Sequence, residues 1–491
     1  MRYDVIVIGG GLGGLECAYI LSRSGRSVLL LEQGAQLGGC MQSYCRRGLK
    51  FDTGFHYVGG LAEGQALHRV FRYLGLLDLP WWRLDDCFDR VVIGGRSFPF
   101  RQGFGPFVQA LAECFPGERK ALASYGALLE RTGAERFRAF SSSATEDASS
   151  LRFWETGAYS YLKDTFSDPL LVEVLAGSSL KMELRRESLP LFTFLHGNAG
   201  FVESSWRLKG SGALIVRALA DEIRAFGGET VCGARVQELV ERNGRVLQAV
   251  CSDGRTYEGK VFVSDVHPVL TYGWVRQSDR LKKAFRRRIA ALGNTSGMCT
   301  VSLLLKPGTF AYLNYNLYVY RGPAVWTSAS ADGVVDRVMV SCRVPEDGGH
   351  YARQVDLLTP MSWESCRKWA TTTVGMRGED YVRLKERMAA QCLALAEEVL
   401  PGLGSCVAEY YVSTPLTYRD YLAAPEGTAY GVRKDFREPL MTVLPVCTPI
   451  PNLLLTGQSL VMHGLEGVTM TALATCAEIL GKNEIGNIIE S

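Results

Sequence analysis

The residues best placed to do chemistry in this sequence are glycines and ionisable side chains near its two ends. Near the start, Gly9, Gly11 and Gly14 have the spacing G-x-G-x-x-G. Between a strand and a helix, such glycines let backbone N–H groups approach a pyrophosphate, and the positive end of the helix dipole stabilises its charge. Glu32, about 20 residues further on, can accept hydrogen bonds from the ribose of the same dinucleotide.

The surrounding residues predict the βαβ unit that this chemistry needs. Residues 3–8 form a largely apolar, β-branched run that predicts a buried parallel strand. A helix follows the glycines and ends near Gly25, and a second strand over residues 27–31 ends at Glu32. Because strand, glycines, helix, second strand and acid occur in the required order, we favour a dinucleotide site over a purely structural glycine turn.

The same segment favours FAD over NADP. An acid at the end of the second strand would repel the 2′-phosphate of NADP. A second glycine pair, Gly38-Gly39, follows Glu32. In extended FAD-binding units such a pair commonly lies beside the diphosphate. We expect FAD to be held here by Gly9, Gly11, Gly13, Gly14, Glu32, Gln33, Gly38, Gly39 and Met41. Because only one complete glycine unit is present, NAD(P)H is expected at most as a transient electron donor.

The C-terminal residues predict a second part of the same site. Residues 452–455 form a short apolar strand, and a helix is predicted over residues 469–480. A glycine-lined helix N-terminus favours the negative charge that develops on the N1–C2=O edge of a reduced flavin. We expect contacts to FAD from Gly457, Gln458, Gly467 and Val468, and from Val236 in the middle of the chain.

The composition excludes several other classes of protein. Lys and Arg number 54 among the 491 residues and Asp and Glu 51, a net charge of +3, which argues against a nucleic-acid partner. The 14 cysteines include no C-x-x-C and the six histidines no H-E-x-x-H, so we expect no metal site and reduced thiols.

Four segments together resemble a known family. They are FDTGFHYVG over residues 51–59, TPLTYRDY over 414–421, NLLLTGQ over 452–458, and the glycine-containing residues 463–469. With SDVHP at 264–268, they resemble the FAD-dependent phytoene desaturases, carotenoid isomerases and retinol saturases, particularly the retinol-saturase-like branch. Glu466 departs from the resemblance, which implies an apolar residue at this position.

The resemblance implies an α/β fold with a discontinuous, Rossmann-like FAD-binding domain of the amine-oxidase (GR2) type and an inserted α+β substrate domain. We place the FAD-binding domain in residues 1–75, 206–268 and 405–491, and the substrate domain in residues 76–205 and 269–404. Residues 76–205 are predicted to be mainly helical and to lack glycine loops, and Asn243-Gly244 predicts a hairpin.

Three ionisable residues beside the flavin motifs are candidates for proton transfer. Glu466 and His463 lie beside the C-terminal glycines, and His56 lies in the DTGFH segment. A buried Glu466 would have a raised pKa and could donate a proton, whereas the helix dipole would keep it ionised. For His56 a structural role is the alternative, and His196 and His267 are predicted to have structural roles.

The resemblance implies an oxidoreductase that acts on C=C or CH–CH bonds of a long hydrophobic polyene or isoprenoid, such as a carotenoid or retinol, by saturation, desaturation or isomerisation. One alternative is an amine-oxidase-like flavoenzyme. Another is a non-catalytic prenyl- or lipid-binding protein similar to Rab GDP-dissociation inhibitors. The complete glycine motif and Glu32 argue against that last alternative, because a protein without a dinucleotide has no use for them.

Aromatic residues suggest where such a substrate would meet the protein. Trp81-Trp82 could dip into lipid headgroups, and Tyr312, Tyr315, Tyr318, Tyr320 and Trp326 could line an apolar tunnel or pack as core. No stretch approaches the roughly 18–20 apolar residues that span a bilayer. We therefore expect a cytoplasmic protein with peripheral contact at the inner face of a membrane.

Overall fold

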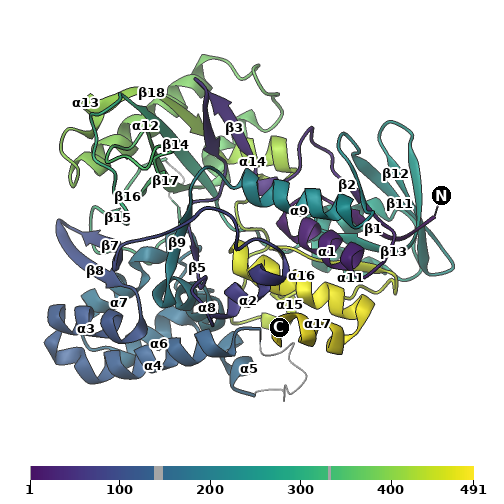
Figure 1. Ribbon diagram of the computed structural model, residues 1–491, viewed down its shortest axis with the longest axis horizontal. Coiled ribbons are helices and arrows are strands. Elements are labelled where there is room, and N and C mark those ends of the chain that lie inside the picture. The colour runs from purple at the N-terminus through teal and green to yellow at the C-terminus, as the bar shows by residue number, and fades with distance from the viewer. Residues whose placement is uncertain (1, 138–147, 330–332, 491) are drawn as a thin grey trace.

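The N-terminal strand lies at the centre of a seven-stranded sheet. In the computed structural model, which describes residues 2–137, 148–329 and 333–490, β1 (Arg2–Ile8) pairs in parallel with β2 (Val28–Leu31) and β13 (Thr256–Ser264). β13 also pairs in parallel with β19 (Leu453–Leu455). The start, middle and end of the chain therefore build one sheet, and the predicted discontinuous, Rossmann-like architecture is confirmed (Figure 1).

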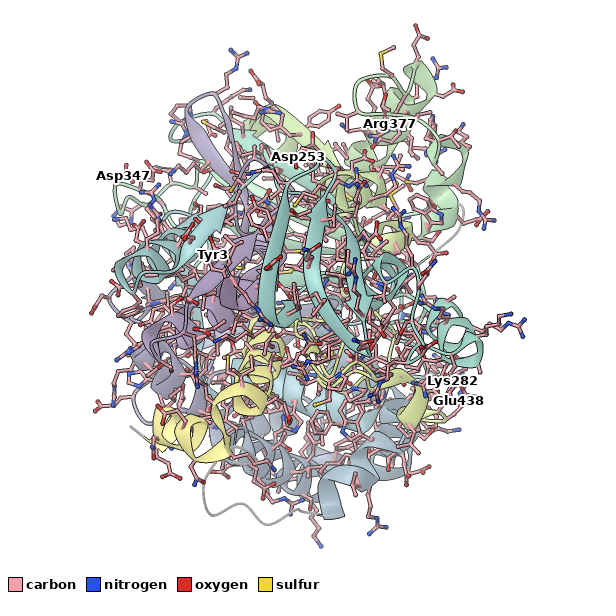
Figure 2. All side chains as sticks on the ribbon, turned by 90° about the vertical axis from the view of Figure 1, so that its right-hand side faces the viewer. Tyr3, Asp253, Lys282, Asp347, Arg377 and Glu438 are labelled. Atoms are coloured by element: carbon pink, nitrogen blue, oxygen red, sulfur yellow. The ribbon has the colours of Figure 1, made fainter. Side chains whose placement is uncertain are left out.

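Three more strands complete this sheet. β10 (Glu229–Val231) pairs with β2, and β11 (Val236–Arg242) and β12 (Arg245–Cys251) form an antiparallel hairpin beside β13. Asn243 and Gly244 connect the hairpin with φ values of +51° and +75°, as a two-residue turn with both central residues left-handed requires. The predicted hairpin is confirmed. In Figure 2 its strands face the viewer, and Asp253 marks the turn that follows β12.

Both faces of this sheet are covered, because its strands are apolar at successive positions. Val5 and Val7 pack with α1 (Leu12–Arg23), α9 (Ala213–Ala225) and α16 (Gly464–Leu480). Ile6 and Ile8 point to the opposite face and share a core with Tyr272 of α10 (Pro268–Trp274) and Ile289 of α11 (Lys283–Ala290). Unbroken burial of this kind is typical of parallel strands in α/β proteins.

A second seven-stranded sheet belongs to the other half of the molecule. Its strand order is β18 (Val407–Ser413), β14 (Gly297–Leu305), β17 (Gln354–Met361), β16 (Arg337–Cys342), β15 (Asn316–Tyr320), β7 (Cys87–Ile93) and β8 (Arg96–Arg101). One face packs on α12 (Glu379–Glu397). The other face packs on a helical layer: α3 (Phe104–Cys114), α4 (Arg119–Glu135), α6 (Ala158–Thr165), α7 (Pro169–Ala176) and α8 (Leu191–Glu203).

The remaining elements are short. β3 (Ser43–Arg46) pairs with β4 (Leu49–Asp52), and β9 (Ser205–Leu208) pairs with β5 (Val58–Gly59) and β6 (Trp81–Arg83). The other α-helices are α2 (Ala66–Tyr73), α5 (Ala148–Trp154), α13 (Leu403–Cys406), α14 (Pro415–Leu422), α15 (Pro439–Thr442) and α17 (Lys482–Glu490).

Residues 76–205 are mainly helical, as predicted, but the expectation that they lack glycine loops is wrong. β6, β7 and β8 lie in this range, and Gly94-Gly95 joins β7 to β8 with φ values of +54° and +81°. β7 is buried at most positions and β8 is only six residues long, so neither gives a long alternating pattern beside the helices that follow. β18 differs as well: residues 407–413 lie in the stretch that we assigned to the FAD-binding domain, but they pair with β14 in the second sheet.

The aromatic pair at residues 81–82 is only partly free to contact a membrane. Trp81 donates a hydrogen bond from Nε1 to the carbonyl of Leu76 at 2.8 Å and packs against Phe55 and Phe71. Trp82 is 41% exposed. Among the described residues, no helix is long and apolar enough to cross a bilayer.

The close contact between β1 and α1 gives a test of the fold. A Cβ on Gly14 would clash with the carbonyl oxygen of Gly9. We expect Gly14→Ala to lower the free energy of unfolding by roughly 1–3 kcal/mol, because a methyl group forced against backbone must displace it. Gly105→Ala in α3 is the control, because its Cβ would meet nothing within 4 Å. Thermal unfolding followed by circular dichroism measures both, and equal stability of the two variants would contradict the assigned contact.

Candidate functional site

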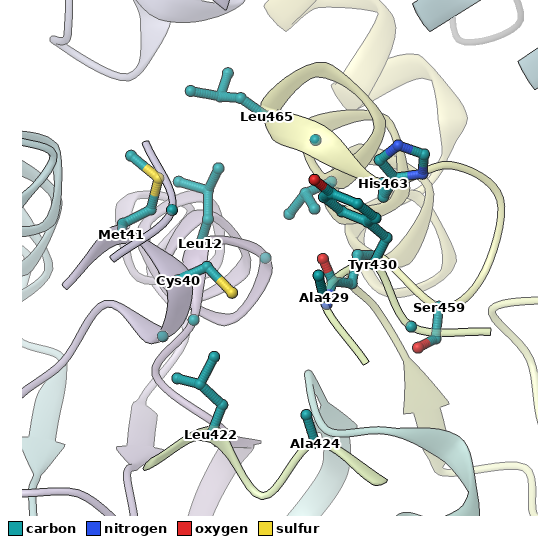
Figure 3. A pocket seen from close by; sticks show the side chains of 18 of the residues that line it. Leu12, Cys40, Met41, Leu422, Ala424, Ala429, Tyr430, Ser459, His463 and Leu465 are labelled. Atoms are coloured by element: carbon teal, nitrogen blue, oxygen red, sulfur yellow. The ribbon is translucent and has the colours of Figure 1, made fainter. Parts of the chain in front are cut away.

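A cavity of about 360 Å³ lies between the two sheets and the helical layer. Its walls come from the loop after β1, the segment 38–42, the turns after β13 and β19, the start of α16, and α8. Figure 3 shows one part of it: Leu12, Cys40 and Met41 face His463, Tyr430 and Ala429 across the open space, with Leu422 and Ala424 below. Segments far apart in the sequence thus meet around a single enclosed space.

Backbone, not side chains, forms the wall of the cavity beside β1. Gly9, Gly11 and Gly13 line it, and a Cβ on Gly11 would come within 2.5 Å of Asp265 Oδ2. The same carboxylate oxygen accepts a hydrogen bond from the Gly14 N–H at 3.0 Å. Burial raises the pKa of Asp265 to about 7, against the lowering effect of that bond. The loop therefore presents bare backbone to a ligand and is braced from behind by one carboxyl group.

Glu32 stands where the second strand ends, at the rim of this loop. Its carboxylate accepts hydrogen bonds from the N–H groups of Gly10 at 2.8 Å and Gly34 at 2.6 Å. The side chain lines the cavity with Gln33, and Val236 of β11 lies in the same wall. Bonds to Gly10 and Gly34 hold the carboxylate in place and leave lone pairs free for ribose hydroxyls.

Most residues that we predicted to hold FAD line this cavity. They are Gly9, Gly11, Gly13, Glu32, Gln33, Gly38, Gly39, Met41, Val236, Gln458 and Val468. Gly14, Gly457 and Gly467 lie behind the wall. A Cβ on Gly457 would clash with Asp265, and one on Gly467 with the backbone of Met462, so these glycines allow close packing of the elements that form the site.

The residues present fit an FAD molecule. A glycine cradle at the N-terminus of α1 suits the pyrophosphate, and an acid at the end of β2 suits the ribose. The N-terminal turn of α16, which begins at Gly464 and not at Thr469 as predicted, lines the same cavity. The prediction placed the start of this helix too late, because Gly464 and Gly467 lie near its beginning and glycine is more typical of loops than of helices.

The two candidate histidines line the cavity but hold their protons weakly. Burial lowers the pKa of His56 to about 4 and that of His463 also to about 4. His56 Nδ1 lies 3.8 Å from Asp356 Oδ2, beyond hydrogen-bond distance, and that carboxylate already accepts from Arg343 at 2.7 Å. Both imidazoles are therefore neutral at physiological pH.

Glu466 also lines the cavity and is part of a buried ion cluster. Its Oε2 accepts from Arg136 Nη1 at 2.7 Å, and the second guanidinium nitrogen of Arg136 pairs with Glu203. Burial raises the pKa of Glu466, and Arg136 opposes the shift. The partner of Glu466 is thus a cation more than 300 residues away, so a position expected to be apolar carries a charge that Arg136 compensates.

Lys181 is a cavity residue that the sequence analysis missed. Its Nζ lies 3.6 Å from the centre of the Tyr57 ring and 4.4 Å from that of Phe201. Burial lowers the pKa of the Lys181 ammonium to about 7, and the Asp89 carboxylate opposes the shift. Tyr57 donates to Asp89 Oδ2 at 2.9 Å, which keeps this carboxylate behind the aromatic wall. A lone lysine in the mixed polar segment GSSLKMELRR gives no sequence signal of such a position.

The structure refines two predictions about side chains in this half of the molecule. His196, to which we gave a structural role, lines the cavity on α8 together with Thr193. Of the two roles considered for the aromatic cluster, core packing is the one that the structure shows: Tyr318, Tyr320 and Trp326 are buried between the second sheet and the helices, and none of the five residues lines the cavity. His267 does cap α10, accepting from the Val269 N–H, although it also reaches the cavity.

Comparison with known proteins agrees with this site. The sequence profile of the family described as flavin containing amine oxidoreductase matches residues 12–480. Human all-trans-retinol 13,14-reductase is 26% identical over 98% of this chain and 86% of its own length. The lycopene-forming phytoene desaturase of Pseudescherichia vulneris is 24% identical over 96% of this chain and 98% of its own.

A solved structure shares the fold. Putrescine oxidase bound to putrescine superposes with a TM-score of 0.66 over 98% of this chain and 99% of its own, at 15% identity. That likeness supports the α/β fold.

The place of Glu32 gives a test of cofactor binding. We expect Glu32→Lys to yield largely colourless protein, because the substitution removes the acceptors for Gly10 and Gly34 and sets an ammonium where ribose hydroxyls need an acceptor. Flavin absorbance per chain after purification measures it. Glu222→Lys on the exposed face of α9 makes the same charge change away from the cavity and should keep its flavin. Stoichiometric FAD in Glu32→Lys would contradict the assignment.

Proposed function

The chain belongs to the family of flavin-containing amine oxidoreductases and is an FAD-dependent oxidoreductase, and from this premise we propose that it saturates a carbon–carbon double bond of a long apolar polyene. Similarity to a retinol 13,14-reductase along nearly the whole chain supports a substrate of the retinoid or carotenoid class. It also favours reduction over desaturation and isomerisation.

The observation that carries this proposal is the make-up of the cavity beyond the glycine loop. Its walls there are mainly apolar or aromatic side chains from both halves of the molecule: Phe201, Met182, Met298, Leu358, Leu422, Ala424, Ala429 and Tyr430. Fewer polar side chains, among them Ser179, Lys181 and Asn198, share these walls. Such walls gain from burying a hydrocarbon and offer little to a polar substrate.

Charge in the same region argues against an amine as substrate. Lys181 lines the cavity, the Asp89 carboxylate that acts on it lies behind the aromatic wall, and Oε2 of Glu466 is bound by Arg136. A protonated amine would meet the charges of Lys181 and Arg136, and the Glu466 carboxylate that could offset them already pairs with Arg136. The amine-oxidase-like alternative is therefore disfavoured, and a purely lipid-binding protein would leave the glycine cradle and Glu32 without a ligand.

Reduction of a double bond requires a hydride on one carbon and a proton on its neighbour. Bound FAD in its reduced form supplies the hydride, with electrons from an external donor such as NAD(P)H. The chain holds the apolar substrate, excludes water and provides the proton. We assign the proton to Lys181, because its ammonium faces the cavity and titrates near neutral pH, whereas His56 and His463 are neutral there and Glu466 is tied to Arg136.

A polyene of this class partitions into membranes, so peripheral membrane contact remains part of the proposal. Of the two tryptophans only Trp82 is available for it, since Trp81 packs inside. Unchanged liposome flotation of Trp82→Ser would remove this residue from the contact.

The proton assignment predicts a pH dependence. Because the donor must be protonated, the rate at which the reduced enzyme reduces polyene should be highest below about pH 7 and fall as pH rises through the Lys181 pKa. Lys181→Met should lower this rate by roughly 10²–10⁴-fold and abolish its fall with rising pH, which we call the pH-dependent limb of the rate profile. Anaerobic single-turnover measurements across pH report both quantities.

Two other variants complete this experiment. Lys163→Met, at an exposed position of α6, should behave as the parent does. Glu466→Gln should keep the limb but lose thermal stability, because Arg136 is left with Glu203 alone. A limb that survives in Lys181→Met and vanishes in Glu466→Gln would transfer the donor role to Glu466.

A further inference from the structure

We infer that the α8 end of the cavity is a binding subsite for a neutral hydroxyl group at the end of an otherwise apolar substrate, formed by Thr193 and His196. This inference rests on the proposed function and adds to it, because it specifies the polar end of the polyene.

Both side chains lie on the face of α8 that lines the cavity. Residues three, four, seven and eight positions apart share one face of a helix. Of the six α8 residues that line the cavity, those at 193, 196, 197, 200 and 201 follow this pattern, and Asn198 lies at its edge. Gly200 packs against Arg136 and Glu466 at the start of α16. At 1.5 Å per residue, Thr193 lies roughly 10 Å and His196 about 6 Å further along the helix, so Thr193 is the member of the pair that is more distant from the α16 end of the cavity.

Two buried polar atoms in this pair lack a partner. The Thr193 side chain belongs to a residue only 2% exposed and that of His196 to one 9% exposed. Within the described part of the chain, neither Thr193 Oγ1 nor His196 Nδ1 forms a hydrogen bond. Buried polar atoms are nearly always satisfied, and two unsatisfied ones on neighbouring residues that line a cavity indicate a ligand group that completes them.

The His196 ring is held rigidly. Phe192 lies 4.1 Å from it, centre to centre, and Trp154 of α5 stacks on the other side of Phe192 at 4.1 Å with an interplanar angle of 18°. This stack fixes the plane of the imidazole, so its nitrogens face a set direction before a ligand binds. An ordered group of this kind loses little conformational entropy on binding.

The chemistry of the pair matches a hydroxyl group. A neutral imidazole has one donor and one acceptor, and a threonine hydroxyl can act as either, so together they can both donate to and accept from a single O–H. Burial and the nearby Arg136 lower the pKa of His196 to about 3, which keeps the ring neutral. Arg136 itself is bound by Glu203 and Glu466 and offers no free cation to a carboxylate.

The test compares two ligands that differ only in the hydroxyl. All-trans-retinol and its analogue with hydrogen in place of the hydroxyl are titrated into FAD-loaded enzyme, and Kd is taken from the change in the flavin spectrum. We expect the parent to prefer the alcohol by about tenfold or more, as the loss of one or two buried hydrogen bonds implies. Thr193→Val and His196→Phe should each reduce this preference toward unity while the Kd of the hydrocarbon stays unchanged.

Matched variants separate recognition from folding. Thr132→Val removes a buried hydroxyl that donates to the Leu128 carbonyl within α4, and should leave the preference intact. Thr193→Ser and His196→Gln keep hydrogen-bonding groups and should retain most of it. A parent that reduces both polyenes and binds them equally, or a Thr193→Val variant with the full preference, would overturn the subsite and leave the proposed function standing. A parent that binds neither polyene would overturn both.

Discussion

The structure depends on the close approach of three backbone segments around Asp265. The loop after β1, the end of β13 and the turn after β19 meet at this side chain, which accepts from the Gly14 N–H and lies against Gly9, Gly11, Gly13 and Gly457. Side chains at these glycines would force the segments apart. Glycine at each position therefore brings the start, middle and end of the chain into one sheet and leaves bare backbone facing the cavity.

The rest of the site follows from what closes over that backbone. α8 and the second sheet cover the cavity with apolar side chains, and this burial keeps the imidazoles of His56 and His463 neutral. The charges that remain are compensated within the wall: Arg136 holds two carboxylates, and Lys181 rests on aromatic faces with Asp89 behind them. A cavity built in this way favours hydrocarbon chemistry with controlled proton supply.

Local patterns allowed much of this to be predicted. The glycine spacing, Glu32 and the hairpin at Asn243-Gly244 are short-range signals, and the structure has the expected βαβ unit and turn. The second sheet was harder, because parallel pairing of β7 with β15 joins residues more than 200 positions apart. Lys181, Thr193 and the partner of Glu466 could not be predicted, since a lone side chain shows its role only when another part of the fold surrounds it.

The most direct measurement mixes anaerobically reduced, FAD-loaded enzyme with all-trans-retinol and follows the flavin spectrum and the polyene together. The account predicts that flavin is reoxidised in step with the loss of one conjugated double bond, one polyene per flavin, and that primary amines leave the oxidised enzyme unchanged. Flavin that stays reduced in the presence of retinoid and carotenoid polyenes, while an amine reduces the oxidised enzyme, would contradict it.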